Sequence, residues 1–461
     1  ILVKLFPHRE YEVAEELEGP AERTGKRLLI VGGGDGQLYG IRYAKATGML
    51  AGVTDANPKA PGAAEADFFR TADTFDPEAT AEAAAELDAE GLVTYGTDQP
   101  VLTVARAAQQ LGLPGPLPVE TALAATNKRV MKRLFTENGI PTCRYRVVRA
   151  GEESRERAEG ESGSGFETAR LRPPLVVKPV DSQGQRGVMR VDSEEELAEH
   201  LPRSLAHSRE GAAVVEEYYE GGEVTFSGWV VDGELYPLTI TDRVTVAKPP
   251  HIGVCVTHNY PSRYFASCGE QILDISKRIV ESFNIPEGPV YFQMLIGSGG
   301  IKVNEIACRI GGAYEDEFIP LLTGVDILGL AFEEAVHGKP KGETLARLRR
   351  FRYPAQGALS VLLFFTGPLT VASTGSMEEV MRVPGVAWGR YLCRPGQRIG
   401  PMENSTGRAG YVIIRGEDGA RVNERIREVY LRLGIHDAEG TNHLIDYSRE
   451  SLHTGPVKGL E

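Results

Sequence analysis

The chain has 461 residues, of which 41% are hydrophobic and 25% charged, and its formal net charge is −13. This composition is typical of a globular protein with two to four domains, and the negative charge argues against nucleic-acid partners and against anionic membranes. No apolar run approaches the roughly 18 residues of a spanning helix, and the five cysteines form no CxxC pair, so we expect a cytoplasmic enzyme without a zinc site or a disulfide framework.

The first structured region is predicted to be a parallel α/β unit over 27–115, preceded by a polar N-terminal extension over 1–26. Strand–helix–strand order repeats along it, which favours parallel pairing. Its expected elements are a buried strand at 26–31, a helix ending near 47, a strand at 51–55 and a strand at 91–95.

A Gly-rich loop, Gly32-Gly33-Gly34-Asp35-Gly36-Gln37-Leu38, follows the first strand. The dinucleotide fingerprint needs a third glycine where Gln37 or Tyr39 stands, so it fails in both registers. Two interpretations remain open: a tight strand-to-helix turn, or a helix N-terminus that holds an anionic substrate group. Asp55, at the end of the second strand, is predicted to cap a turn rather than to bind a ribose.

The middle of the chain, 116–345, is predicted to form two lobes with a mobile surface insertion over 151–172, and a C-terminal α/β domain occupies 346–458. The expected elements of the middle region are a helix at 127–138, strands from 175 to about 306, one helix near 269–283 and a helix at 326–336. Those of the C-terminal region are strands at 357–364 and 410–415 and a helix at 420–433.

Lys178 is the one charged residue in the apolar strand 175–180, and a buried lysine needs an anion. A loop over 181–187 follows, and its glycines can free backbone N–H groups to hold phosphates. An ordinary hairpin loop is the alternative.

The next predicted strand and the turn after it carry Glu216, Glu217, Tyr219 and Glu223. Acidic side chains repel phosphates, but they can accept hydrogen bonds from an adenine amino group, from ribose hydroxyls or from a substrate amine. Solvated acids on an edge strand are the alternative.

A polar loop over 241–261 carries Arg243, His251 and His258. These side chains either meet a substrate carboxylate or serve as a base for an incoming amine, and decoration of the surface is the alternative.

A β-hairpin is predicted from two apolar runs around Ser298-Gly299-Gly300. A three-residue loop pairs 297 with 301, 295 with 303 and Gln293 with Glu305, which places the last two side chains opposite each other. They are either an unrelated polar pair or ligands of a hard cation such as Mg²⁺. Arg309, four residues further on, can stabilise charge on a transferring phosphoryl group. Cys308 is expected to pack rather than react.

Together these motifs resemble the ATP-grasp superfamily, and specifically its L-amino-acid ligase and carboxylate–amine ligase branch. The matching strings are Asn127-Lys128 before a helix, Val-Val-Lys-Pro, Glu-Glu-Tyr-x-x-Gly-x-Glu, Gln…Glu-x-x-x-Arg-x-Gly-Gly and Thr-Gly-Val-Asp at 323–326. The resemblance implies an α/β fold in which an N-terminal parallel α/β domain precedes the α+β grasp lobes and a C-terminal mixed α/β domain follows them.

Residue roles are implied by the same resemblance. Lys128 and Lys178 would contact ATP phosphates, and the 181–187 loop, with Ser182, Gln183, Gly184 and Gly187, would close over them. Glu216, Glu217 and Tyr219 would surround adenine, and Glu223 would hold the ribose. Gln293 and Glu305 would bind Mg²⁺, with Mn²⁺ as an alternative, and Arg309 would steady a phosphorylated intermediate. Arg243, His251, His258, Gly311 and Gly312 would face the substrates. Ala307 stands where many members have Asn, which leaves the number of metal ions open.

The implied reaction is ATP-dependent activation of a small-molecule carboxylate as an acyl phosphate, followed by attack of an amine. Positioning and charge neutralisation suffice for such chemistry. Alternatives are a carboxylase or purine-pathway ligase of the same superfamily, or an ATP-binding module without turnover. Homodimers are common among proteins of this kind.

Overall fold

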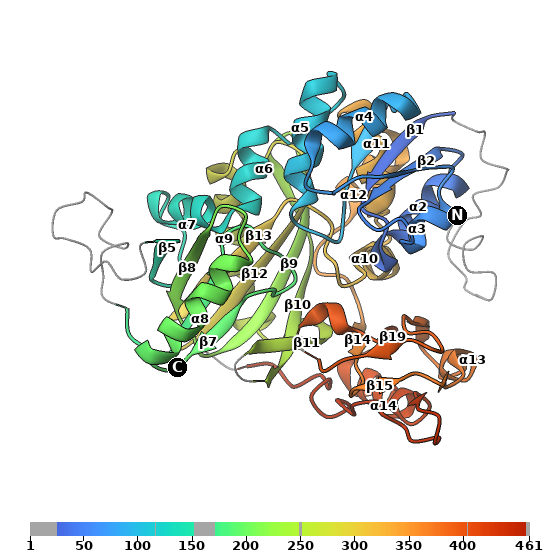
Figure 1. Ribbon diagram of the computed structural model, residues 1–461. Coiled ribbons are helices and arrows are strands. Elements are labelled where there is room, and N and C mark those ends of the chain that lie inside the picture. The colour runs from blue at the N-terminus through green and yellow to red at the C-terminus, as the bar shows by residue number, and fades with distance from the viewer. Residues whose placement is uncertain (1–24, 116, 152–170, 249–250, 403, 458–461) are drawn as a thin grey trace.

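The computed structural model describes residues 25–115, 117–151, 171–248, 251–402 and 404–457. Residues 1–24 of the expected N-terminal extension (1–26) and residues 152–170 of the expected insertion (151–172) lie outside the described residues. Three bodies can be followed in Figure 1: an N-terminal unit at the top, a small lobe around β5 and β8 on the left, and a C-terminal segment at the bottom. The long strands β9–β13 run between them.

The sheet of the N-terminal unit is parallel, as the sequence predicts, and its strand order is β3-β2-β1-β4, where β3 is a strand that the sequence analysis missed. Its strands are apolar and fully buried at the centre: Leu29 and Val31 of β1 pack under helices α4 and α5. The chain runs from β1 to β2 and β3 on one side of β1 and then returns to place β4 on the other side. The strand order therefore reverses between β1 and β4, which is where ligands of open α/β sheets bind. The elements are β1 Arg27–Val31, α2 Leu38–Ala46, β2 Leu50–Asp55, α3 Pro61–Glu65, β3 Phe68–Thr71, α4 Pro77–Leu87, β4 Gly91–Val93, α5 Pro100–Leu111 and α6 Val119–Thr126.

The turn after β2 confirms the predicted role of Asp55. Its carboxylate accepts hydrogen bonds from the Gly33 N–H at 2.9 Å and from the Asn57 N–H at 2.8 Å. Asp55 therefore ties the Gly-rich loop to the turn after β2.

The small lobe is an antiparallel sheet in the order β5-β8-β6-β7, covered by a helix that the sequence analysis missed. Ser193 caps this helix, α8, by accepting from the Glu196 N–H, and Leu197, Leu201 and Leu205 pack onto the sheet. The expectation of a single helix between 175 and 306 is thus wrong, because α8 precedes α9. The elements are α7 Lys128–Glu137, β5 Tyr145–Arg149, β6 Leu175–Pro179, β7 Met189–Val191, α8 Glu194–Ala206 and β8 Ala212–Glu217.

The centre of the molecule is an eight-stranded antiparallel sheet in the order β13-β12-β9-β10-β11-β14-β19-β17. Strand β11 pairs with β14, so the sheet continues without a break from the grasp region into the C-terminal segment. The elements are β9 Gly222–Val231, β10 Glu234–Lys248, β11 His251–Tyr260, α9 Phe265–Ser282, β12 Gly288–Gly297, β13 Gly300–Ala307, α10 Glu315–Thr323, α11 Ile327–His337 and α12 Gly342–Arg350.

The hairpin of β12 and β13 differs in register from the sequence prediction. Gly297 pairs with Gly300 around a two-residue turn, so the predicted pairs 297–301 and 295–303 are wrong. A bulge at Asn304 then restores the register, and Gln293 does face Glu305 as predicted. The extra residue of a β-bulge compensates for the turn that is one residue shorter.

The C-terminal segment packs α14 against one face of β14 and β19, where Val422, Ile426 and Val429 are fully buried. The strands and helix predicted for this region are found within a residue or two at β14 and β19 and three residues short at the end of α14. The elements are β14 Ala358–Phe364, β15 Leu369–Thr370, β16 Ser373–Thr374, α13 Met377–Met381, β17 Val386–Tyr391, β18 Arg398–Ile399, β19 Gly410–Gly416, α14 Gly419–Tyr430 and β20 Ile435–His436.

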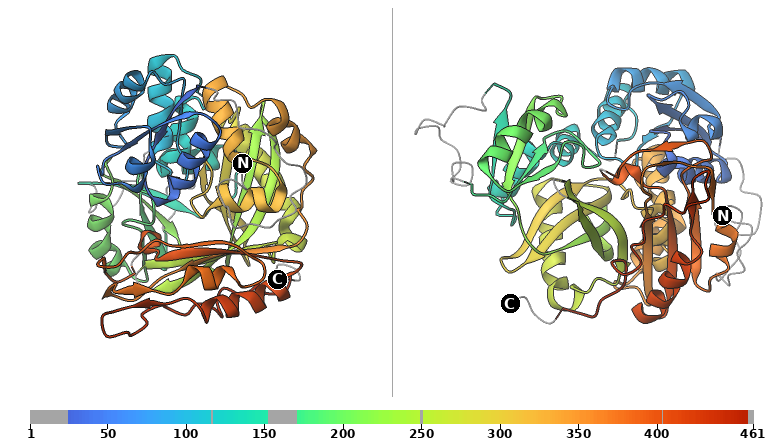
Figure 2. Two further views of the ribbon diagram at one scale, coloured as in Figure 1. Left: turned by 90° about the vertical axis from the view of Figure 1, so that its right-hand side faces the viewer. Right: turned by 60° about the horizontal axis from the view of Figure 1, so that its bottom comes forward.

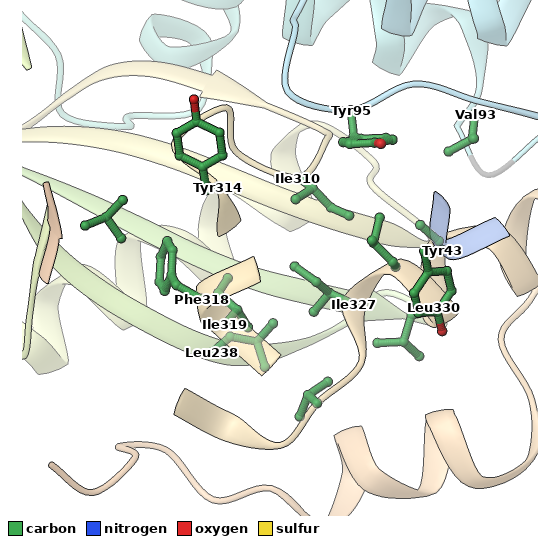
Figure 3. Close-up of a cluster of buried hydrophobic side chains, with 14 of the residues drawn as sticks. Tyr43, Val93, Tyr95, Leu238, Ile310, Tyr314, Phe318, Ile319, Ile327 and Leu330 are labelled. Atoms are coloured by element: carbon green, nitrogen blue, oxygen red, sulfur yellow. The ribbon is translucent and has the colours of Figure 1, made fainter. Parts of the chain in front are cut away.

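One hydrophobic cluster joins the N-terminal unit to the central sheet (Figure 3). Tyr43 and Tyr95 of the N-terminal unit lie in it beside Ile310, Phe318 and Leu330 of the grasp region. Burial of this apolar surface fixes the carboxyl edge of the parallel sheet against the segment that follows β13. Within the described ranges, no helix is both long and apolar enough to cross a membrane.

Candidate active site

A cavity of about 670 Å³ lies where the three bodies meet. Loops after β1 and β4 contribute Gly34–Gln37 and Gly96–Asp98 to its wall, so it opens at the point where the strand order of the parallel sheet reverses. The remaining wall comes from the small lobe, from β9–β13 and from the C-terminal segment, which Figure 2 shows lying across from the N-terminal unit.

Most of the predicted site residues line this cavity. They are Lys128, Lys178, Ser182, Gln183, Gly184, Glu216, Glu217, Tyr219, Glu223, Arg243, His258, Gln293, Glu305, Arg309 and Gly312. Two predicted glycines do not line it: Gly187 packs against Pro179 and His207, and Gly311 donates its buried N–H to Glu315 at 2.7 Å. The predicted loop over 241–261 is wrong, because this segment forms the end of β10 and all of β11, which pair with each other. His251 begins β11, but its side chain lies outside the described part of the structure.

Gln293 and Glu305 form a pair of oxygen donors on the cavity wall. They face each other across β12 and β13, and the Glu305 side chain is 26% exposed with Lys128 Nζ at 3.2 Å. Two protein oxygens beside open volume fit Mg²⁺, which retains water and phosphate oxygens in its shell. The bulge turns Asn304 into the same wall, a placement that the sequence analysis missed.

Lys178 lies in a buried charge cluster at the floor of the cavity. Its ammonium contacts Glu216 and donates to Asn304 Oδ1 at 2.7 Å, while Lys132 Nζ lies 2.7 Å from the other Glu216 oxygen. Burial alone would raise the pKa of Glu216, but the two ammonium groups outweigh it and lower the pKa to about 2. Glu216 therefore stays ionised and holds Lys178 at the cavity; its expected contact with adenine remains a prediction.

The loop over 181–187 contacts several parts of the chain. Gln183 Oε1 accepts from the N–H groups of Asp98 and Gln99 at 2.8 and 3.0 Å, Lys128 Nζ donates to Ser182 O at 3.0 Å, and Gln185 donates to a backbone carbonyl of β11. The backbone of this loop thus lies beside both lysines predicted to meet phosphates.

The residues predicted around the nucleoside are each engaged by a neighbour. Glu217 pairs with Arg144, Tyr219 donates to the Gly300 carbonyl at 2.7 Å, and Glu223 accepts from Arg243 at 2.6 Å. The predicted ribose ligand and the predicted substrate ligand are therefore ion-paired with each other.

Arg309 is 7% exposed and is held by Asp98, which accepts from its Nε at 2.8 Å and also from Nη2. Its Cζ atom lies 4.7 Å from the centre of the Tyr291 ring. Asp98 was missed by the sequence analysis, because it precedes Arg309 by 211 residues and carries no local signal. Its carboxylate fixes the guanidinium plane on the wall of the cavity.

His258 is poorly suited to the predicted role of a base for an incoming amine. It is 4% exposed, its Nδ1 lies 3.3 Å from Thr241 Oγ1, and burial together with the charges of Arg243 and Arg408 lowers its pKa to about 3. A neutral, weakly basic imidazole can still hydrogen-bond a substrate. Cys308 is buried, and burial raises the pKa of its thiol to about 12, which fits the predicted packing role.

The buried carboxyl group of Glu315 makes the stability of the fold depend on pH. It is 3% exposed and accepts from Ser227 and from the Gly311 N–H, and burial raises its pKa from 4.5 to about 6 despite these bonds and Arg309. Because the folded pKa lies above the unfolded one, its contribution is present in full below pH 4.5 and is lost as pH rises through 6.

We therefore expect the stability of the native chain relative to Glu315→Gln to fall by about 1–2 kcal/mol between pH 4.5 and pH 7. Urea unfolding of both proteins at the two pH values measures this difference. A difference that is constant with pH would contradict the raised pKa.

Two segments of the chain match models of ligase families. Residues 134–266 match the family model "D-ala D-ala ligase C-terminus", and residues 362–436 match "L-amino acid ligase C-terminal domain 2". A D-alanine–D-alanine ligase of Geobacter sulfurreducens is 27% identical over 260 residues, which cover 52% of this chain and 72% of that protein. An L-arginine-specific L-amino acid ligase of Bacillus subtilis is 27% identical over 222 residues, 47% of this chain and half of that protein.

Among solved structures, the L-amino acid ligase from Bacillus licheniformis superimposes with a TM-score of 0.74 at 21% identity, over 90% of this chain and 99% of that one. This similarity shows that the chain has the ATP-grasp fold predicted from its motifs.

Proposed function

We propose that this chain, an ATP-grasp ligase of the carboxylate–amine type, activates a carboxylate with ATP as an acyl phosphate and joins it to an amine, releasing ADP and phosphate. The observation that carries the proposal is the convergence of Lys178, the Gln293–Glu305 pair and Arg309 on one cavity. The relatives described above support the reaction class.

At the phosphate end, Lys128 and Lys178 would neutralise charge on the ATP phosphates, and the adjacent 181–187 backbone would donate to them. Gln293 and Glu305 would hold Mg²⁺, which supplies charge neutralisation for the transferring phosphoryl group. The pairing of Lys178 with buried Glu216 keeps its ammonium in place before ATP binds, so little reorganisation is needed when the phosphates arrive.

The proposed chemistry has two balanced steps. In the first, a carboxylate oxygen forms a bond to the γ-phosphorus while the bond from phosphorus to the β–γ bridging oxygen breaks, and ADP leaves. In the second, the amine nitrogen attacks the carbonyl carbon, the bond from carbon to the phosphorylated oxygen breaks, and phosphate leaves as the amine loses a proton. Arg309, fixed by Asp98, would stabilise the negative charge that develops beside it in both steps.

The test is a screen for release of ADP and phosphate with Mg·ATP and pools of amino acids, small carboxylates and bicarbonate, followed by mass spectrometry. We expect ADP release that needs one acid and one amine and gives a product of their summed mass minus water. Release of ADP with bicarbonate alone would favour the carboxylase alternative, and release of AMP would overturn the acyl-phosphate step.

A further inference from the structure

The C-terminal segment provides part of the cavity wall, and this part includes a cation that the proposed reaction does not use. Leu363, Leu392, Gln397, Thr406 and Arg408 reach the cavity from strands and loops of this segment. Arg408 is half-buried and lies two residues before Gly410, where β19 begins.

The other half-buried or buried cations of the cavity wall are each paired with a carboxylate. Lys128 pairs with Glu305, Lys178 with Glu216, Arg243 with Glu223 and Arg309 with Asp98. Among the described residues, no carboxylate lies within 4 Å of Arg408. The same holds for Arg186, but that side chain is exposed on the loop beside the phosphate end.

The guanidinium of Arg408 makes few hydrogen bonds of its own. Nη1 donates to the Gly312 carbonyl at a long 3.4 Å, and Nε is buried without a hydrogen-bond partner among the described residues. The guanidinium also interacts with the Tyr314 side chain, which leaves several of its five donors for a planar anion.

The position of Arg408 is set by an aromatic platform. Its Cζ lies 5.3 Å from the centre of the Tyr314 ring, which stacks on Tyr411 at 3.4 Å with an angle of 11°. Tyr314 has φ = 62°, a left-handed conformation that is costly for a residue with a side chain and that the surrounding packing must enforce. A guanidinium held beside a ring by a cation–π contact can still present donors to a carboxylate.

Arg408 reaches the cavity beside the segment that carries Arg309, on elements other than those of the proposed phosphate and metal ligands. Gly312, which Arg408 contacts, follows Arg309 by three residues, whereas the lysines and the Gln293–Glu305 pair lie on the small lobe and on the β12–β13 hairpin. Uncompensated positive charge also reaches His258, whose pKa it helps to lower. Anions other than the ATP phosphates are therefore attracted to this end of the cavity.

We propose that Arg408 binds a substrate carboxylate that the reaction does not consume. This inference rests on the proposed function, which supplies the carboxylate substrates. It implies that the C-terminal segment helps to determine which substrates the cavity accepts. The carboxylate is either that of an amino-acid acceptor or the second carboxylate of a dicarboxylic donor; both present the same planar anion to the guanidinium.

The test measures thermal stabilisation of protein saturated with Mg²⁺ and the ATP analogue AMP-PNP. The probes are each of the twenty L-amino acids, the matching L-amino-acid amides, and succinate and glutarate. Arg408→Gln is compared with the native chain and with Arg398→Gln, a control on exposed β18 that lies outside the cavity wall.

We expect at least one free acid, and not its amide, to stabilise the native chain and the Arg398→Gln control. Arg408→Gln should need about 10- to 100-fold more of the same acid, because a charge-assisted hydrogen-bonded pair is lost. Stabilisation by an amino acid would assign the carboxylate to the acceptor, and stabilisation by a dicarboxylate would assign it to the donor.

Two outcomes overturn the proposal: an Arg408→Gln variant that binds acids as the native chain does, or a native chain that no acid stabilises. Failure of the proposed function is distinguishable, because stabilisation that depends on Arg408 without any ADP release would leave the carboxylate site standing and remove the ligase reaction.

Discussion

Glu305→Ala should lower kcat by about 10³-fold while leaving the fold intact, because it removes the only carboxylate of the proposed Mg²⁺ pair. The side chain is 26% exposed, and its ion-pair partner Lys128 keeps a hydrogen bond to the Ser182 carbonyl at 3.0 Å after the substitution, so we expect the fold to survive. Rates at increasing Mg²⁺, together with thermal melting of both proteins, measure the effect.

Glu220→Ala is the matched control, because Glu220 is an exposed acid that lies outside the cavity wall. This variant should keep the native rate. If Glu305→Ala also keeps full activity, or if the two variants lose activity equally, the metal assignment is wrong.

Arg309→Lys should lower kcat by about 10²-fold with little change in the KM for ATP. Lysine keeps the positive charge but cannot reproduce the two-pronged contact with Asp98, so the charge moves away from the transferring group. Steady-state kinetics with ATP and the acid varied separately test this expectation.

Two further variants serve as comparisons for Arg309→Lys. Arg352→Lys changes an exposed arginine outside the cavity wall and should be silent. Asp98→Asn keeps one hydrogen-bond acceptor for Arg309 and should cost less than Arg309→Lys. A rise in the KM for ATP with kcat unchanged in Arg309→Lys would instead place this residue at the nucleotide.

The parts of the site that the sequence predicts are those built from neighbouring residues. Gln293 and Glu305 lie 12 residues apart on one hairpin, so apolar patterning and a Gly-rich turn were enough to place them face to face. The exact register was not predictable, because the two-residue turn and the bulge at Asn304 compensate for each other. The alternation of apolar and polar residues indicates which face of the sheet a side chain occupies. A bulge shifts the residues beyond it to the other face, and the alternation alone does not reveal where the bulge lies.

Contacts between segments that are distant in the chain could not be predicted from the local sequence. Asp98 meets Arg309 only because the N-terminal sheet packs against the segment after β13, and Arg408 arrives from the C-terminal segment through the β11–β14 pairing. Helix α8, by contrast, could have been predicted from the sequence. Ser193 and Glu196 form a typical N-terminal cap, and the leucines at 197, 201 and 205 form an apolar stripe. The sequence analysis missed the helix because it interpreted the whole region as strands.

Transfer of ¹⁸O from a labelled carboxylate is the most direct test of the central claim. With the acid found in the ADP-release screen, labelled in both carboxylate oxygens, the account predicts one ¹⁸O in the released phosphate and one in the amide product. Label that appears in AMP, or phosphate that carries none, would contradict activation through an acyl phosphate.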